Sequence, residues 1–177
     1  MKRQKREHFI IDGYNVINAW PELIAMRDNL AYARDRLIHI LAEYGAYEGY
    51  DVTIVFDALF TENEQTYEKI NDHLYIIYTD EGETADSYIE KLAYTLVREG
   101  KEVHVVTSDG AEQSLILGAG AYRMPSLELL KAVRKAKKII REEYTGEYLL
   151  PMNRRELGGR IDGETAAKLD KLRKKNM

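Results

Sequence analysis

Four short apolar runs, each followed closely by an aspartate, constrain most strongly what this chain can fold into. A short apolar run bounded by turn residues is typical of a buried strand. A carboxylate at the end of such a strand lies at the rim of an open parallel sheet, where these sheets bind ligands. A single aspartate before a glycine is also an ordinary turn, so the repetition is what indicates a site. The runs cover 9–11, 52–56, 74–79 and 103–108, and they end in Asp12, Asp57, Asp80 and Asp109.

Helical patterns alternate with these runs, which predicts an α/β fold with a mostly parallel central sheet flanked by helices on both faces. We expect three long helices, over 28–47 with Asp28 as N-cap, from about 85 to 99, and over 126–144 with Ser126 as cap. The remaining expectations are a long loop over 58–73, a short helix over 111–117, a strand over 121–124 and a short final helix after residue 162.

The composition suits one globular domain with a short appendage. The chain has 177 residues, of which 45% are hydrophobic and 32% are charged. We expect a domain over residues 1–145 and a linker with a short basic helix over 146–177. The chain contains no cysteine, which excludes disulfides and thiolate metal sites and fits the cytoplasm. We expect no secretion signal and no membrane span, because Asp12 interrupts the first apolar run.

The net charge of −4 is unevenly distributed along the chain. Residues 7–125 carry 22 acids and 8 Lys or Arg, or −14, whereas residues 126–177 carry 8 acids and 14 Lys or Arg, or +6. Such a distribution suits a metal site beside a surface for a polyanion. One face of the expected helix over 126–144 is basic, and it is either a contact for nucleic acid or a solvated face. Its residues are Lys131, Arg134, Lys135, Lys138 and Arg141.

Asp86 is the most informative single residue of the sequence. At 100° per residue it falls between Ala93 and Val97 on the apolar face of its helix. A carboxylate facing the core costs several kcal/mol unless it is paired or binds a cation. The alternative is that Asp86 only stabilises the first turn of the helix through the helix dipole.

In a parallel sheet the carboxylates of Asp12, Asp57, Asp86 and Asp109 converge at one end. Two such charges 4 Å apart repel by up to about 4 kcal/mol at an effective dielectric near 20, so the cluster needs a cation. Oxygen ligands without histidine or cysteine suit Mg²⁺ or Mn²⁺. Ions of this kind bind phosphate groups and activate water for attack at phosphorus. We interpret the four histidines, His8, His39, His73 and His104, as structural.

Four ordered motifs resemble those of YacP-like NYN-domain proteins. The resemblance covers about residues 9–144 and extends weakly into the tail. The motifs are Ile11-Asp12-Gly13-Tyr14-Asn15-Val16-Ile17 with Ala19-Trp20-Pro21, then Val55-Phe56-Asp57-Ala58, Gly82-Glu83-Thr84-Ala85-Asp86, and Thr107-Ser108-Asp109 with Glu112-Gln113.

This resemblance implies a PIN-like three-layer fold and metal-dependent RNA cleavage, in a family that includes a ribosome-associated endonuclease cutting mRNA during translation. It places the acidic metal ligands at Asp12, Asp86 and Asp109, with Asp57 and Asn15 in support. The expected cofactor is Mg²⁺ or Mn²⁺ without a nucleotide cofactor, and the expected partner is RNA, as mRNA on the ribosome, and no membrane. The alternatives are a non-catalytic module that binds RNA or the ribosome, and a small-molecule phosphatase, which the absence of an Asp-x-Asp motif after the first strand disfavours.

Overall fold

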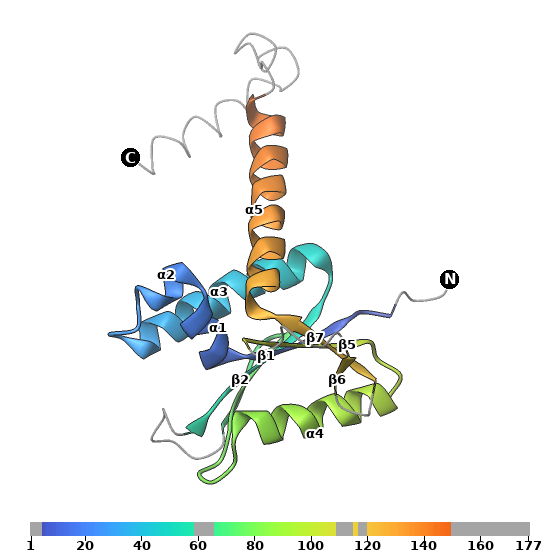
Figure 1. The fold of residues 1–177 in the computed structure, drawn as a ribbon. Helices are drawn as coiled ribbons and strands as arrows, with labels where there is room; N and C mark the ends of the chain where they lie inside the picture. The colour runs from blue at the N-terminus through green and yellow to red at the C-terminus, as the bar shows by residue number, and fades with distance from the viewer. Residues whose placement is uncertain (1–4, 59–65, 109–114, 117–119, 150–177) are drawn as a thin grey trace. The chain divides into compact units, whose positions relative to one another are not determined.

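The computed structural model describes residues 5–58, 66–108, 115–116 and 120–149. The chain divides into two compact units, Met1–Ala136 and Lys137–Met177. The first unit contains the sheet and the helices that cover it (Figure 1). The domain boundary that we expect near residue 145 stays a prediction.

Seven strands form one sheet in the order β3-β4-β2-β1-β5-β7-β6. The five central strands are parallel to one another, and the edge strands β3 and β6 pair antiparallel with their neighbours. The mostly parallel α/β sheet predicted from the sequence is therefore confirmed. The strands are β1 (His8–Asp12), β2 (Asp51–Phe56), β3 (Thr66–Asn71), β4 (Leu74–Tyr78), β5 (Val103–Thr107), β6 (Leu115–Ile116) and β7 (Ala121–Pro125).

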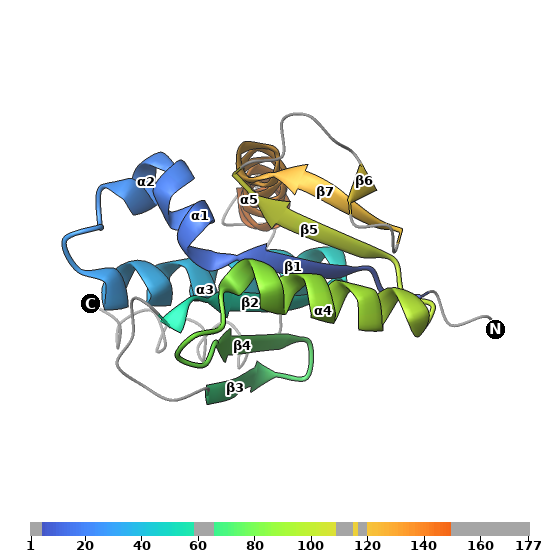
Figure 2. The ribbon, with the colours of Figure 1, turned by 60° about the horizontal axis from the view of Figure 1, so that its bottom comes forward.

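Helices cover both faces of the sheet, as Figure 2 shows for α3 and α4. Successive residues of a strand point to opposite faces, so Phe9 and Ile11 enter one core while Ile10 enters the other. The first core includes residues of α1, α3 and the start of α5, and the second is closed by α4. The helices are α1 (Gly13–Ala19), α2 (Pro21–Ile24), α3 (Leu30–Glu48), α4 (Ala85–Arg98) and α5 (Ser126–Leu149).

Two expected elements are wrong in part. The expected loop over 58–73 contains β3, whose residues 67–71 are all exposed. Backbone pairing with β4 forms this strand without burial, so it leaves no apolar period in the sequence. The expected helix over 111–117 is wrong at 115–116, where β6 pairs with β7, and its other residues lie outside the described part of the chain.

Two expected caps are also corrected. The N-cap of α3 is Asn29, whose side chain accepts a hydrogen bond from the N–H of Tyr32 at 3.1 Å, and not Asp28. Both residue types are good caps, so the sequence does not distinguish neighbours. Ser126 is the first residue of α5 rather than the residue before it, and α5 extends past Tyr144 to Leu149.

The change from β1 to α1 depends on a glycine. A Cβ atom at Gly13 would lie 2.3 Å from Cε1 of Phe56, which is a contact that real Cβ atoms do not make. Phe56 is fully buried at the end of β2. The absence of a side chain at Gly13 therefore allows the first turn of α1 to pack against the end of the neighbouring strand.

We expect Gly13→Ala to destabilise the fold by about 1–3 kcal/mol through overpacking, although alanine is the better helix former. The free energy of unfolding from denaturant titration measures the effect. In a Phe56→Leu background the same substitution should cost less, because the ring edge is gone. A stabilising Gly13→Ala, as at an open helical position, would contradict the packing argument.

Candidate active site

Asp12 is the last residue of β1 and lies between β2 and β5, with 5% of its surface exposed. The side-chain amide of Asn15 donates a hydrogen bond to Oδ2 of Asp12. The carbonyl oxygen of the same amide accepts a hydrogen bond from the hydroxyl of Ser108 at 3.1 Å. Asn15 thus joins the carboxyl group of Asp12 to the residue that follows β5.

The charges of two further acids affect the pKa of the Asp12 carboxyl group. Burial raises the pKa of the Asp12 carboxyl group to about 6, the Asn15 hydrogen bond opposes this rise, and the charges of Asp86 and Asp57 add to it. Like charges raise a carboxyl pKa only when they lie near it. The charges of acids from β1, from the end of β2 and from α4 therefore act on one another at the carboxyl end of the sheet, although their ligand atoms do not all lie within 4.8 Å of one another.

Asp57 connects this end of the sheet to α4. Its carboxylate accepts a hydrogen bond from the N–H of Ala85, the first residue of α4, at 3.2 Å. Thr84 caps the same helix by accepting a hydrogen bond from the N–H of Ser87 at 3.1 Å. A carboxylate beside a helix N-terminus is stabilised by the unpaired N–H groups there. Asp57 therefore fixes the backbone from which Asp86 projects.

The expectation that the carboxylate of Asp86 faces the core is wrong, because its side chain is exposed. The buried face of α4 consists of Ala85, Ile89, Ala93 and Leu96. Asp86 lies in the first turn of α4, where the helix begins, so its side chain is exposed although the helical period places it close to the buried face. Asp109, the other expected ligand, lies outside the described residues, and Asp80 is exposed.

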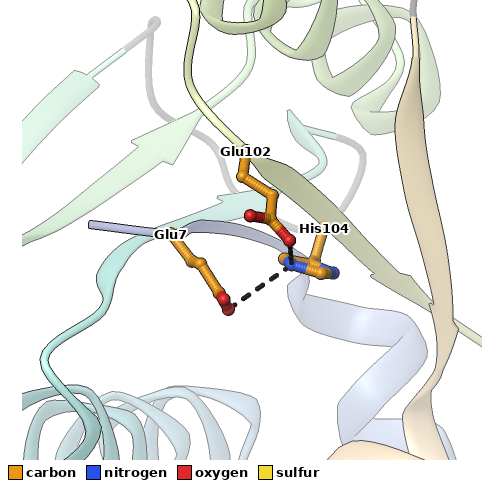
Figure 3. Close-up of side chains that lie close together, drawn as sticks. All are labelled: Glu7, Glu102 and His104. Carbon is orange, nitrogen blue, oxygen red and sulfur yellow. Dashed lines mark ion pairs between the residues drawn. The ribbon is translucent and has the colours of Figure 1, made fainter. Parts of the chain in front are cut away.

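A second group of possible metal ligands lies at the opposite end of β1 (Figure 3). Glu7, Glu102 and His104 are the one group, within the described part of the chain, whose ligand atoms all lie within 4.8 Å of one another. Nε2 of His104 is 3.5 Å from a carboxylate oxygen of each glutamate. The group is consistent with a divalent ion. Glu7 precedes Asp12 by five residues, or roughly 16 Å of extended strand, so the two groups cannot share an ion.

The histidines take no part in the acid cluster. His8 is buried, and its Nε2 lies 2.8 Å from the hydroxyl of Thr53. Burial lowers the pKa of His8 to about 4, so its ring is neutral at physiological pH. His73 is hydrogen-bonded to Asp51, the first residue of β2, and the ring of His104 stacks on Phe9 at 4.8 Å.

Sequence reasoning missed two residues beside the cluster, Ser108 and Arg34. The guanidinium of Arg34, on α3, donates a hydrogen bond to the hydroxyl of Tyr14 at 3.0 Å. Arg34 follows Leu30 by four residues and precedes Leu37 by three, so helical spacing already places it at the edge of the apolar face. An arginine at that edge was the signal that could have identified it.

The predicted basic face of α5 is solvent-exposed. Lys138 lies 3.9 Å from Glu142 one turn later, an exposed pair that contributes little to stability. Among the described helices, none has the length and apolar character that crossing a bilayer requires. The exposed basic residues are Lys131, Arg134, Lys135, Lys138 and Arg141.

Comparison with known proteins supports the fold. A family model described as the YacP-like NYN domain matches residues 9–174. YacP of Bacillus subtilis (strain 168) is 42% identical over 153 residues, which cover 80% of this chain and 88% of YacP.

The crystal structure of a mutant of Rae1 (YacP) from Bacillus subtilis superposes with a TM-score of 0.70 at 35% identity, covering 94% of this chain and 99% of that one. A second structure of Rae1 (YacP) gives a TM-score of 0.66 at 36% identity, covering 95% of both chains. The predicted PIN-like NYN fold is therefore confirmed.

The raised pKa of Asp12 predicts a pH-dependent effect of Asp12→Asn on stability without metal. The folded-state pKa of about 6 exceeds the ordinary value of 3.8, so the folded protein loses stability as the pH rises through about 6. The asparagine variant carries no charge at this position. With a chelator present, it should exceed the wild type by about 3 kcal/mol in unfolding free energy at pH 8 and match it near pH 3.5.

Urea titrations at the two pH values measure this difference. Asp35→Asn is the matched control, since Asp35 is an exposed side chain of α3. Equal effects of Asp12→Asn at both pH values would show that the carboxyl group of Asp12 is not strained by burial and by its acidic neighbours.

Proposed function

The chain belongs to the YacP-like NYN domain family, a PIN-like nuclease family, and from that premise we propose that it is a Mg²⁺-dependent endoribonuclease that cleaves mRNA held on the ribosome. The observation that carries the proposal is that the charges of Asp57 and Asp86 act on the buried carboxyl group of Asp12 at the carboxyl end of the sheet. A bound cation would relieve their mutual repulsion, and it would also activate water for the hydrolysis of a phosphodiester.

The donor set of this cluster suits Mg²⁺ or Mn²⁺. It contains carboxylate and amide oxygens and no imidazole, as these hard ions prefer. Mg²⁺ keeps several of its waters and binds one or two carboxylates, so it does not require the three acids to touch one another. Asp12 and Asp86 would hold the ion, and Asp109 would complete the set. When bound, the ion supplies an activated water and positive charge beside the phosphate.

Neighbouring residues hold the proposed metal ligands in position. Asn15, held by the hydroxyl of Ser108, orients the carboxyl group of Asp12 through its amide. Asp57 holds the first turn of α4, and its charge adds to the rise in the pKa of Asp12 that burial and Asp86 produce. Near neutral pH this carboxyl group is largely ionised, which suits a metal ligand.

The basic face of α5 supports a contact with RNA or the ribosome. The residues from 7 to 125 carry a charge of −14, which repels RNA at long range, whereas positive charge is concentrated from residue 126 onwards and in the first six residues. A substrate held in a fixed orientation lets the basic part bind while the acidic site reaches one phosphate. The cysteine-free sequence supports action in the cytoplasm. The proposal includes no nucleotide cofactor and no membrane partner.

We expect Asp86→Asn to abolish cleavage while the fold is preserved. Asp86 is exposed, so neutralising it removes an ion ligand without disturbing the core. Cleavage of a message in stalled translation complexes, with Mg²⁺ or with chelator, measures the activity, and circular dichroism measures the fold. Glu99→Gln, at the far end of α4, is the matched control and should cleave like the wild type.

Two outcomes would overturn parts of this proposal. Wild-type rates in Asp86→Asn would remove this residue from the metal site. A wild-type protein that binds the complexes but cuts no RNA at any Mg²⁺ concentration would instead be a non-catalytic binding module.

We expect naked RNA to be cut more slowly than the same message on a ribosome. The ribosome holds the message in a fixed orientation, which lowers the entropy cost of reaching the transition state. Both forms are compared at equal RNA concentration and about 0.15 M salt, where screening acts over roughly 8 Å. Changing Lys131, Arg134, Lys135 and Lys138 together to Gln should weaken binding and flatten its salt dependence. Single-turnover cleavage at saturating substrate should persist in that variant. Equal cleavage of naked RNA would make the protein a general ribonuclease.

A further inference from the structure

Arg34 is a cation that forms no ion pair with the described residues, and it lies near the end of the sheet that carries the acids. It is half-buried on α3, and its Nη1 donates to the hydroxyl of Tyr14 at 3.0 Å. In the described part of the chain, no carboxylate lies within ion-pair distance of its guanidinium. A guanidinium has five N–H donors in a planar fork, so the hydrogen bonds of Arg34 to the hydroxyls of Tyr14 and Tyr78 leave donors for another acceptor.

Aromatic rings fix the position of Arg34 relative to the acids. The ring of Tyr14 packs against Phe56 at 5.1 Å, and Phe56 stacks on Tyr78 at 5.5 Å. Phe56 directly precedes Asp57 at the end of β2, and Tyr14 follows Asp12 by two residues. Arg34 therefore lies beside the ends of β1, β2 and β4, on the face of the sheet that α3 covers.

The charges support the same placement. Burial raises the pKa of the Tyr14 hydroxyl, the charge of Arg34 lowers it, and the charge of Asp57 raises it. The pKa of Tyr78 is likewise raised by burial and lowered by Arg34. One guanidinium therefore acts on both hydroxyls, and one of these hydroxyls also lies within the field of the acid cluster.

An arginine at this place, with no ion pair among the described residues, is suited to bind an anion from outside the protein. RNA that enters the site brings several phosphates, and the acids repel all of them. Arginine is the residue best suited to a phosphate, since it can donate two parallel hydrogen bonds. Tyr14 restricts the rotation of the side chain, which reduces the entropy lost on binding.

We propose that Arg34 binds a phosphate of the RNA backbone next to the phosphodiester that is cleaved, with the hydroxyl of Tyr14 holding the guanidinium in place. The inference rests on the proposed ribonuclease function, because it concerns the substrate of the same site. The contact is to the backbone, so it is independent of base sequence.

The test measures binding in full-length Asp12→Asn protein, which removes turnover, with a fluorescent single-stranded RNA at salt concentrations from about 20 to 200 mM. Adding Arg34→Gln should raise the dissociation constant about tenfold and reduce the magnitude of the log–log salt slope by about 0.7. Arg36→Gln is the matched control, since Arg36 is a half-buried arginine of the same helix on a different side. It should leave the slope unchanged.

Two more variants separate charge from orientation. Arg34→Lys keeps the charge and should restore the salt slope but not the full affinity. Tyr14→Phe removes the hydroxyl and should weaken binding with the slope unchanged. In the cleaving protein with Asp12 intact, Arg34→Gln should raise KM more than it lowers kcat.

The outcomes distinguish this inference from the proposed function. If the wild type cleaves RNA while Arg34→Gln and Arg36→Gln bind with the same affinity and slope, the assignment of Arg34 is wrong and the nuclease proposal stands. If the protein neither binds nor cleaves RNA, naked or on ribosomes, both are overturned.

Discussion

The structure depends on a carboxylate that is buried where the central strand ends. Asp12 has a strand on either side and a helix directly after it, so it cannot turn into bulk water. Two further acids and an amide are arranged around it, and they oppose one another in their effects on its pKa. A buried carboxyl group with two acidic neighbours adds nothing to the packing of the core. Perturbed carboxyl groups of this kind concentrate at functional sites, where the charge serves the chemistry.

The sequence predicts those parts of the fold that burial forms. Four of the five central strands are apolar runs because helices cover both of their faces, whereas β7 is partly exposed. The helices α3 and α4 show the spacing of helices with one buried side. β3 was not predicted because backbone pairing at an edge does not require apolar side chains. β6 was not predicted because two residues, Leu115 and Ile116, are too few to show the pattern of a strand. The predicted N-cap of α3 lies one residue before the observed Asn29, because aspartate and asparagine are both good N-caps.

The sequence predicts which acids belong to the candidate site. It predicts less well which of them are exposed and which other side chains lie beside them. Turn-bounded strands locate Asp12 and Asp57, because the chain must leave the sheet at these residues. The exposure of Asp86 depends on where its helix begins, which a helical period alone does not determine. The contact between Arg34 and Tyr14 joins two elements that lie far apart in the sequence, and their packing exists only in the folded chain.

Both edges of the sheet resist further strands. β3 carries Glu68 and Lys69 in an exposed position, and β6 is only two residues long. Charged or very short edge strands prevent edge-to-edge pairing, which otherwise leads to aggregation. A partner would therefore gain little by adding a strand to this sheet. The loops and helix ends at the carboxyl end of the strands remain as the surface that a partner can recognise. Because the edge strands prevent further pairing, a partner of this protein binds near the acids.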